Sequence, residues 1–222
     1  MKKYVVIVAG GKGKRMGSEQ SKQFLEVENL PILMHTFRAF SFLGNTVEFI
    51  LVLSADDIDH WEELCKIHDF NIPHQIVEAG PKRFHSVKIG LRLVPENALV
   101  SIHDAVRPFV SKQVIEACFT MAAHKGNAVP VIPIDESMRE LSGTLSKSIN
   151  RNKFRLVQTP QVFFSSDIKQ AYQQPYNESF TDDATVMERT GKQIYLVEGN
   201  KENIKITHPV DLAFAKAFLG SF

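Results

Sequence analysis

Residues 1–17 read MKKYVVIVAGGKGKRMG, and they place an apolar, strand-like run directly before a glycine-rich loop. The strand is expected over 4–8, and the loop after Ala9 holds four glycines, Gly10, Gly11, Gly13 and Gly17. Three cations are interleaved with them, Lys12, Lys14 and Arg15. Glycine permits tight turns and close approach of a ligand to backbone amides, and cations beside such amides suit a polyphosphate. This stretch therefore predicts an α/β protein that handles a nucleotide or a sugar phosphate.

Strand and helix patterns alternate over the rest of the chain. Further strands are expected at 49–53, 75–77, 99–102, 128–134 and 194–197, and helices at 31–43, 56–68, 83–93, 112–124, 181–189 and 209–219. Asp56 or Asp57 is expected to cap the second helix and Ser111 the fourth, and the prolines of 128–134 suggest an edge strand or a break. This rhythm predicts a mostly parallel sheet with helices on both faces. Ligands of such sheets bind at the carboxyl ends of the strands, where the glycine loop lies.

The rhythm stops at residues 135–152. This stretch is polar and carries a Ser142-Gly143 turn with weak alternation on either side of it, which favours a projecting β-hairpin over a core helix. Regular structure is expected to resume with the helix at 181–189. We therefore expect a single domain over residues 1–222 with the hairpin as an arm on it.

The composition is ordinary for a soluble globular protein, with 44% hydrophobic and 23% charged residues and a formal net charge of +1. So small a net charge argues against broad nucleic-acid binding. Cys65 and Cys118 form no CxxC or zinc pattern and are expected to be reduced. No apolar run reaches about 18 residues, so no membrane helix is expected. No cleavage site follows the run that ends at Ala9. These features predict a cytoplasmic protein.

The spacing of the glycine loop excludes two common phosphate-binding motifs. Walker A requires GxxxxGK[ST], which the chain lacks, and the third glycine of a dinucleotide fingerprint would fall on Met16. The pattern GGxGxRMG, followed by Ser21-Lys22-Gln23-Phe24, instead resembles the nucleotidyltransferase signature, in which the loop wraps a nucleoside triphosphate. The alternative is a tight turn with solvated lysines.

A second segment, His103-Asp104-Ala105-Val106-Arg107-Pro108, directly follows an expected strand. An aspartate at that strand end shares a rim with the glycine loop, so Asp104 could hold Mg²⁺ or orient a ribose. Magnesium bound to phosphates needs only one or two protein carboxylates. In the alternative reading, Asp104 caps a turn and pairs with Arg107.

Four further segments are less specific alone. Gly80-Pro81-Lys82-Arg83-Phe84-His85-Ser86 opens an expected helix, where amides and Ser86 could read a base edge. Asn150-Arg151-Asn152 precedes Gln158-Thr159-Pro160-Gln161, and Thr181-Asp182-Asp183 starts another expected helix. Lys205 stands between Ile204 and Ile206 in an expected strand, so its side chain should point into solvent or into a cleft.

Taken in this order, the six segments resemble the 2-C-methyl-D-erythritol 4-phosphate cytidylyltransferases over essentially the whole chain. The resemblance implies a Rossmann-like α/β domain with a protruding hairpin arm, and a homodimer whose arms interlock. It implies that CTP and methylerythritol phosphate are joined with Mg²⁺ present and that pyrophosphate is released, without nucleic-acid or membrane partners.

The resemblance also implies roles for particular residues. Arg15 and Lys22 would stabilise the transition state, and Arg151 and Lys205 would position the methylerythritol phosphate. Arg151, at the base of the arm, would serve the neighbouring subunit's site. The nucleotide and substrate would be bound by Ala9, Gly10, Gly11, Gly13, Gly80, Ser86, Asp104, Arg107, Ser137, Thr159 and Thr181. Ser137 replaces a threonine common in the family and keeps the hydroxyl, whereas Pro81 replaces an acidic residue and is given no role.

The implied chemistry needs cations and no general base. The acceptor's phosphate oxygen is already anionic when it attacks the α-phosphorus of CTP in line, so the site must offset charge on the phosphoryl oxygens. Two other functions remain open. One is a related enzyme that uses a pentitol phosphate such as ribitol 5-phosphate, although the stretch SINRNKFRLVQTPQ is more similar to the isoprenoid enzyme. The other is a non-catalytic nucleotide-binding domain, which would not need four such cations.

Overall fold

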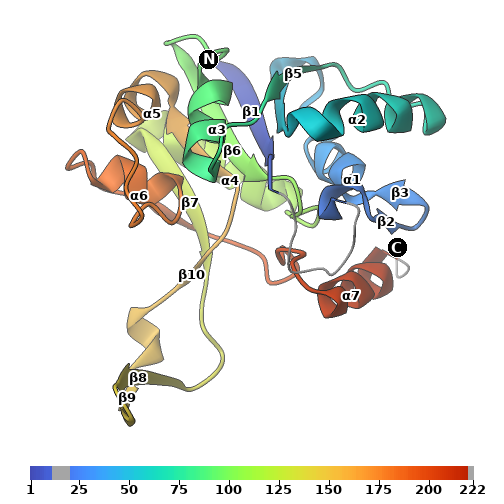
Figure 1. Ribbon diagram of the computed structural model, residues 1–222. Helices are drawn as coiled ribbons and strands as arrows, with labels where there is room; N and C mark the ends of the chain where they lie inside the picture. The colour runs from blue at the N-terminus through green and yellow to red at the C-terminus, as the bar shows by residue number, and fades with distance from the viewer. Residues whose placement is uncertain (12–20, 220–222) are drawn as a thin grey trace.

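The structure, a computed structural model, describes residues 1–11 and 21–219, and its main feature over these residues is an eight-stranded sheet (Figure 1). The strand order is β10-β7-β11-β6-β1-β4-β5, and β12 also pairs with β7. The strands of this sheet are β1 (Lys2–Ala9), β4 (Val47–Leu53), β5 (His74–Glu78), β6 (Ala98–Asp104), β7 (Asn127–Ile132), β10 (Leu156–Val157), β11 (Gln161–Phe164) and β12 (Leu196–Glu198). Two smaller antiparallel pairs are β2 (Glu26–Val27) with β3 (Leu30–Pro31), and β8 (Met138–Ser142) with β9 (Leu145–Ile149).

Helices cover both faces of the sheet, as predicted. They are α1 (Ile32–Ala39), α2 (Ala55–Ile67), α3 (Arg83–Leu91), α4 (Lys112–Lys125), α5 (Ser165–Ala171), α6 (Asp183–Glu188) and α7 (Pro209–Leu219). Side chains of β1 alternate between the faces: Val5 and Ile7 pack in one cluster with α1, α2 and α4, and Tyr4 and Val6 pack in another with α3, α5 and α6. Among the described residues, no helix has the length and apolar character that crossing a membrane requires.

The middle of the sheet is parallel. β1 lies between β4 and β6 and runs parallel to both, and β5 continues the parallel order beside β4. β11 runs antiparallel to β6 and β7, which makes the sheet mixed but mostly parallel. The carboxyl ends of β1, β4 and β6 therefore meet at one edge, where the segments that follow Ala9, Leu53 and Asp104 come together.

The predicted hairpin is confirmed. β8 and β9 pair from Met138 with Ile149 to Ser142 with Leu145, and Gly143 turns between them with φ of 59°. Figure 1 shows that this pair extends away from the body. At its base, Asp135 pairs with Lys201 of the body at 2.5 Å.

Three helix predictions need correction at their ends. The helix expected over 31–43 stops at Ala39, where the hydroxyl of Ser41 donates to the Arg38 carbonyl, and the 3₁₀ segment η3 (Ser41–Thr46) follows. Ser54, rather than Asp56 or Asp57, is the N-cap residue of α2. The helix expected over 83–93 ends at Leu91. By contrast, Ser111 caps α4 as predicted, because its hydroxyl accepts from the Val114 amide.

The sheet was also incompletely predicted. β10, β11 and α5 fill residues 156–171, where no regular structure was expected. β7 ends at Ile132 and is no edge strand, because β10 and β11 pair along it antiparallel and β12 pairs along it in parallel. Pro130 has no backbone N–H to donate to a neighbouring strand. Its carbonyl accepts from the backbone amide of Gln158, which lies between β10 and β11. The strand expected around Lys205 is not formed, because residues 203–207 have no regular secondary structure and the Ile206 amide donates to the Val106 carbonyl in a loop.

Candidate active site

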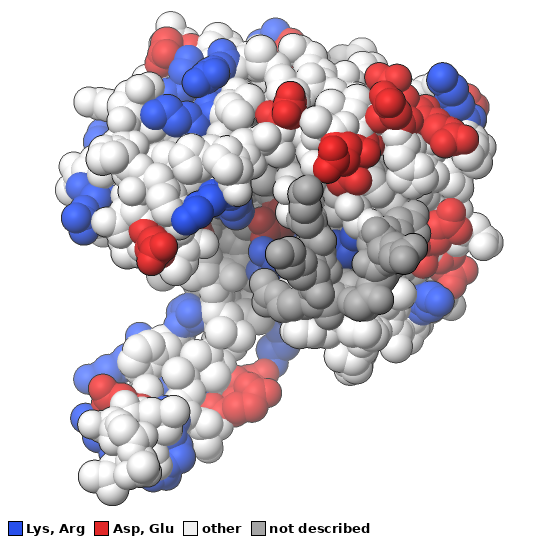
Figure 2. Space-filling model, in the orientation of Figure 1, with Lys and Arg blue, Asp and Glu red and all other residues white. Residues whose placement is uncertain are grey.

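A pocket of about 650 Å³ opens at the carboxyl ends of β1, β4 and β6, which is a suitable size for a nucleotide. The predicted residues on its wall are Ala9, Gly10, Gly11, Lys22, Gly80, Asp104 and Lys205. Figure 2 shows lysine and arginine side chains in and around the hollow on this face. Two predicted loop residues, Gly13 and Arg15, lie outside the described residues, as do Lys12 and Lys14.

The glycine wall is tightly constrained at Gly10. A Cβ atom built there would lie 2.5 Å from the Cβ of Ala79 and 3.3 Å from the hydroxyl of Ser86. Gly11 has no such neighbour within 4 Å among the described residues. A side chain at residue 10 would therefore clash with Ala79, which follows β5, so glycine is required there. Gly11 has open space beside it on the described wall.

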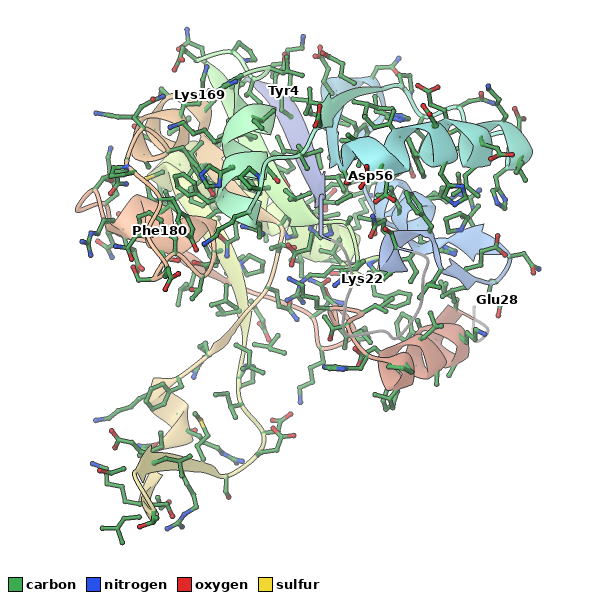
Figure 3. The ribbon with its side chains drawn as sticks, viewed as in Figure 1. Tyr4, Lys22, Glu28, Asp56, Lys169 and Phe180 are labelled. Carbon is green, nitrogen blue, oxygen red and sulfur yellow. The ribbon has the colours of Figure 1, made fainter. Side chains whose placement is uncertain are left out.

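Lys22 begins η2 (Lys22–Phe24), a 3₁₀ turn fixed to the end of β1. The buried side-chain amide of Gln23 donates to the Ala9 carbonyl at 3.1 Å and to the Asp57 carboxylate at 3.1 Å. This contact fixes η2 beside the glycine wall, so Lys22 lines the pocket. Figure 3 labels Lys22 and Asp56, two wall residues that come from different elements.

Asp104 is the residue at which three cationic side chains converge. Only 6% of this residue is exposed, yet three cations surround its carboxylate. Lys205 Nζ lies 2.8 Å from Oδ2, Arg107 Nε 3.5 Å from Oδ2, and Arg83 Nε 3.3 Å from Oδ1. Burial opposes ionisation, but the three cations hold the pKa of Asp104 well below its usual range. Asp104 is therefore an ionised carboxylate, and it does pair with Arg107 as the alternative reading held.

The segment that carries Lys205 is fixed to the body on both sides of the lysine. The buried Asn203 side chain donates to the Thr159 carbonyl at 2.8 Å, and the Ile206 amide donates to the Val106 carbonyl at 3.0 Å. The Lys205 side chain is 41% exposed and faces Asp104. The sequence predicts that the Lys205 side chain points either into solvent or into a cleft, and in the structure it lies on the wall of the pocket.

Three predicted binding residues lie behind the wall rather than on it. The Ser86 hydroxyl donates to the Lys82 carbonyl at 3.2 Å. Arg107 donates to the Asn203 carbonyl at 2.7 Å. The Thr159 hydroxyl accepts from the Asp104 amide at 3.1 Å and is also 3.1 Å from Nδ1 of His103. In this structure these residues support the pocket from inside.

His103 belongs to the same supporting layer. Its Nε2 lies 3.0 Å from the Arg107 carbonyl, so this nitrogen carries the proton and Nδ1 accepts from Thr159. Burial lowers the pKa of His103 to about 4, which keeps the ring neutral near pH 7. A buried neutral histidine of this kind positions the loop after β6 and carries no charge to the pocket.

Three further predicted residues are not brought to the pocket of this chain. Ser137 is exposed at the base of the hairpin, and Arg151 is exposed in η4 (Arg151–Lys153). Thr181 is exposed just before α6, with its hydroxyl 3.4 Å from that of Thr185. None of the three lines the pocket as the described residues form it.

Two wall residues had been given no role from the sequence. Arg83 starts α3 and reaches both Asp104 and the buried Asp183, and Lys82 lines the pocket beside it. The sequence did contain a signal for them, because a Lys-Arg pair at a strand-to-helix junction puts both cations on the ligand edge of the sheet.

A protein-only metal site is not found in the part of the chain that the structure describes. No group of three or more histidine, cysteine, aspartate or glutamate side chains that could hold a metal occurs among residues 1–11 and 21–219. A metal at this pocket would therefore need ligands from the bound phosphates. Asp104 suits that arrangement, because it is ionised and a carboxylate offers about four acceptor positions, of which Lys205 and Arg83 take two, while Arg107 Nε makes no hydrogen bond at 3.5 Å.

Comparisons with known proteins cover nearly the whole chain. Residues 3–221 match the family described as 2-C-methyl-D-erythritol 4-phosphate cytidylyltransferase. The enzyme of that name from Bacteroides fragilis is 51% identical, covering 96% of this chain and 98% of its own. The one from Bacteroides thetaiotaomicron is 48% identical, covering 99% and 100%.

Solved structures agree with these sequence relatives. The crystal structure of that cytidylyltransferase from Thermus thermophilus is 30% identical, with a TM-score of 0.77 and 98% of each chain covered. The 4-diphosphocytidyl-2C-methyl-D-erythritol synthase of Anaerococcus prevotii is 25% identical, with a TM-score of 0.84 over 99% of this chain and 96% of the other.

Proposed function

The chain belongs to the 2-C-methyl-D-erythritol 4-phosphate cytidylyltransferase family, and we infer that its pocket joins CTP to 2-C-methyl-D-erythritol 4-phosphate. The products are 4-diphosphocytidyl-2-C-methyl-D-erythritol and pyrophosphate. Near 50% identity over the full length of named relatives favours this reaction over pentitol phosphate transfer and over a non-catalytic nucleotide-binding domain. The observation that carries the assignment to this pocket is Lys205 held against Asp104 on its wall.

The reaction is a phosphoryl substitution that needs positive charge. An anionic oxygen of the acceptor phosphate attacks the α-phosphorus of CTP in line, a new P–O bond forms, and the bond to the β-phosphate breaks. Pyrophosphate leaves with the electron pair, so no proton has to be removed from the nucleophile. Fixed cations lower the barrier by offsetting repulsion between the two substrates and charge on the phosphoryl oxygens.

We assign the cations of this chain to parts of that reaction. Lys22, beside the glycine wall, would contact the triphosphate, and Arg15 would stabilise charge at the α-phosphate. Lys205 would bind the acceptor phosphate. The support for Lys205 is its partly exposed side chain at the pocket wall, in a segment fixed by Asn203 and Ile206.

We propose that Asp104 holds Mg²⁺ when CTP is bound. The support is its ionised carboxylate on the pocket wall, which keeps acceptor positions beyond those that Lys205 and Arg83 take. Magnesium usually takes one or two protein carboxylates together with phosphate oxygens and water. The ion would neutralise part of the charge on those phosphate oxygens.

We also propose a homodimer in which the hairpin of one subunit reaches the other's site. Two apolar side chains of the hairpin are unusually exposed, Leu141 at 76% and Leu145 at 74%. Apolar surface of this kind favours a protein partner. Arg151, at the base of the hairpin and away from its own pocket, would then serve the neighbouring subunit.

A cytoplasmic location is part of the proposal. Both cysteines are free thiols, and reduced thiols are typical of that compartment.

The test of the site assignment is Lys205→Ala, with Lys192→Ala as its control. Lys192 is also a lysine paired with an aspartate, Asp167, but on the surface away from the pocket. Lys205→Ala should lower kcat/KM for methylerythritol phosphate by about 10²- to 10³-fold. The affinity for CTP, measured by calorimetry without acceptor, should stay unchanged. Equal losses for both substrates, or activity like that of Lys192→Ala, would contradict the assignment.

A further inference from the structure

A buried carboxylate at the start of α6, Asp183, faces the active site from behind. Its exposed fraction is 0%, and three donors close around it. Tyr172 Oη donates to Oδ1 at 2.5 Å, and the two terminal nitrogens of Arg83 donate to Oδ1 and Oδ2 at 2.9 and 2.8 Å. This is a charge-assisted pair in the bidentate geometry that is strongest between arginine and a carboxylate.

The carboxylate of Asp183 is not used to cap its own helix. The N-cap of α6 is the preceding residue, Asp182, which makes a reciprocal capping box with Thr185. The buried Gln161 fixes this helix start to β11, because its amide donates to Asp182 at 2.9 Å and its oxygen accepts from the Ala184 amide at 2.8 Å. Asp183 is thus presented on a rigid base and is directed at Arg83.

Arg83 divides its donors between two carboxylates. Its terminal nitrogens are held by Asp183, and only Nε reaches Asp104, at 3.3 Å. α3, which begins with Arg83, and α6 pack on the same face of the sheet (Figure 1). Arg83 contacts Oδ1 of Asp104, and Oδ2 lies 2.8 Å from Lys205 Nζ.

We propose that Asp183, supported by Tyr172, is a positioning residue for the acceptor phosphate, and it acts by preventing Arg83 from pairing bidentately with Asp104. The proposal rests on the proposed function, in which Lys205 binds that phosphate. Without the charge of Asp183, the fork of Arg83 turns to the nearest remaining carboxylate, Asp104, and displaces Lys205. Asp183 does not line the pocket that the described residues form, so its effect passes through Arg83, Asp104 and Lys205.

The experiment compares Asp183→Asn with Asp167→Asn in steady-state kinetics and in CTP calorimetry. Asparagine preserves the shape and removes the charge, and Asp167 is a surface carboxylate in an ordinary pair with Lys192. Asp183→Asn should raise KM for methylerythritol phosphate by about ten- to a hundredfold, whereas CTP affinity, measured without Mg²⁺ because Asp104 is the proposed metal ligand, stays that of the wild type. Asp167→Asn should match the wild type in both. A purely structural role would instead lower the folded fraction and leave both constants unchanged.

A double variant tests the route of the effect. If Asp183 acts through Lys205, Asp183→Asn combined with Lys205→Ala should lose no more activity than Lys205→Ala alone. A further loss on top of Lys205→Ala would overturn the proposal. So would an Asp183→Asn enzyme whose KM equals that of Asp167→Asn.

Tyr172→Phe keeps the test decisive if Asp183→Asn does not fold. It removes one hydroxyl hydrogen bond to Asp183 and should raise the same KM by up to about tenfold. Its control is Tyr176→Phe, since Tyr176 packs on Phe84 as Tyr172 does. Equal KM values for these two variants would overturn the proposal. A wild-type enzyme without turnover of methylerythritol phosphate would instead contradict the proposed function.

Discussion

Asp104 shows how one residue of this site depends on parts of the chain far away in sequence. Its place at the end of β6 could be predicted, because an apolar strand leads directly into it. Its pairing with Arg107, three residues later, was a foreseeable alternative. Its contacts with Arg83 and Lys205 could not be foreseen, because they depend on how α3 and the segment after Asn203 fold back to the strand end. The local sequence pattern identifies this carboxylate, but it does not identify the cations that lower its pKa.

His74 provides a pH-dependent contribution to stability away from the pocket. Trp61 Nε1 donates to its Nε2 at 2.9 Å, and its Nδ1 lies 2.7 Å from the Ile72 carbonyl. The indole nitrogen can only donate, so His74 is neutral with its proton on Nδ1. Burial lowers the pKa of His74 below its ordinary value. Protonation would place a second donor against the Trp61 N–H.

The stability that neutral His74 contributes should be lost in acid. An unfolded histidine has a pKa of about 6.5, so this contribution is complete above that pH and is lost as the pH falls through the lower folded pKa. Trp61 is the single tryptophan of the chain, and its fluorescence reports the contact. An acid titration should change Trp61 emission in the wild type but not in His74→Gln, whose amide oxygen can accept from Trp61. Identical titrations of the two proteins would contradict this role.

At the scale of elements, long apolar strands and strong caps were predictable. β1, β4 and β6 were identified from buried runs, and α4 from the cap Ser111. β11 was missed because four residues are too few to show a period. α5 was missed although Ser165-Ser166-Asp167 is a typical helix start, so that signal could have been used.

The hairpin of β8 and β9 is the element on which the dimer proposal depends. If each Arg151 serves the neighbouring subunit, mixing inactive Arg15→Ala with inactive Arg151→Ala creates heterodimers with one complete site. With random subunit exchange, the mixture should regain roughly a quarter of wild-type activity, since half of the dimers are mixed and half of their sites are intact.

The control for this mixing experiment is either variant alone, taken through the same exchange. Each should stay inactive. Pyrophosphate release measures activity, and mass spectrometry of a tagged and an untagged subunit measures exchange. If the mixture stays inactive although exchange is complete, each site is built from a single chain and the shared-site proposal is wrong.

At the scale of the whole molecule, the pocket is made of segments that the sheet brings together. Ala9, Lys22, Gly80, Asp104 and Lys205 come from distant parts of the chain and share one wall. The gathering of Ala9, Gly80 and Asp104 could be predicted, because parallel strands deliver their carboxyl ends to one edge, whereas Lys22 and Lys205 lie on no strand end. Which residues stand on the wall and which behind it could not, because Ser86, Arg107 and Thr159 form internal hydrogen bonds that only the folded chain defines.

The most direct test of the central claim is turnover by the wild-type protein with CTP, Mg²⁺ and each of two acceptors. Phosphorus NMR would follow the loss of the CTP α-phosphate signal and the appearance of a diphosphate diester and pyrophosphate. We expect equal amounts of 4-diphosphocytidyl-2-C-methyl-D-erythritol and pyrophosphate from 2-C-methyl-D-erythritol 4-phosphate, and little product from ribitol 5-phosphate. Robust turnover of ribitol 5-phosphate alone, or bound CTP with no pyrophosphate from either acceptor, would contradict the account.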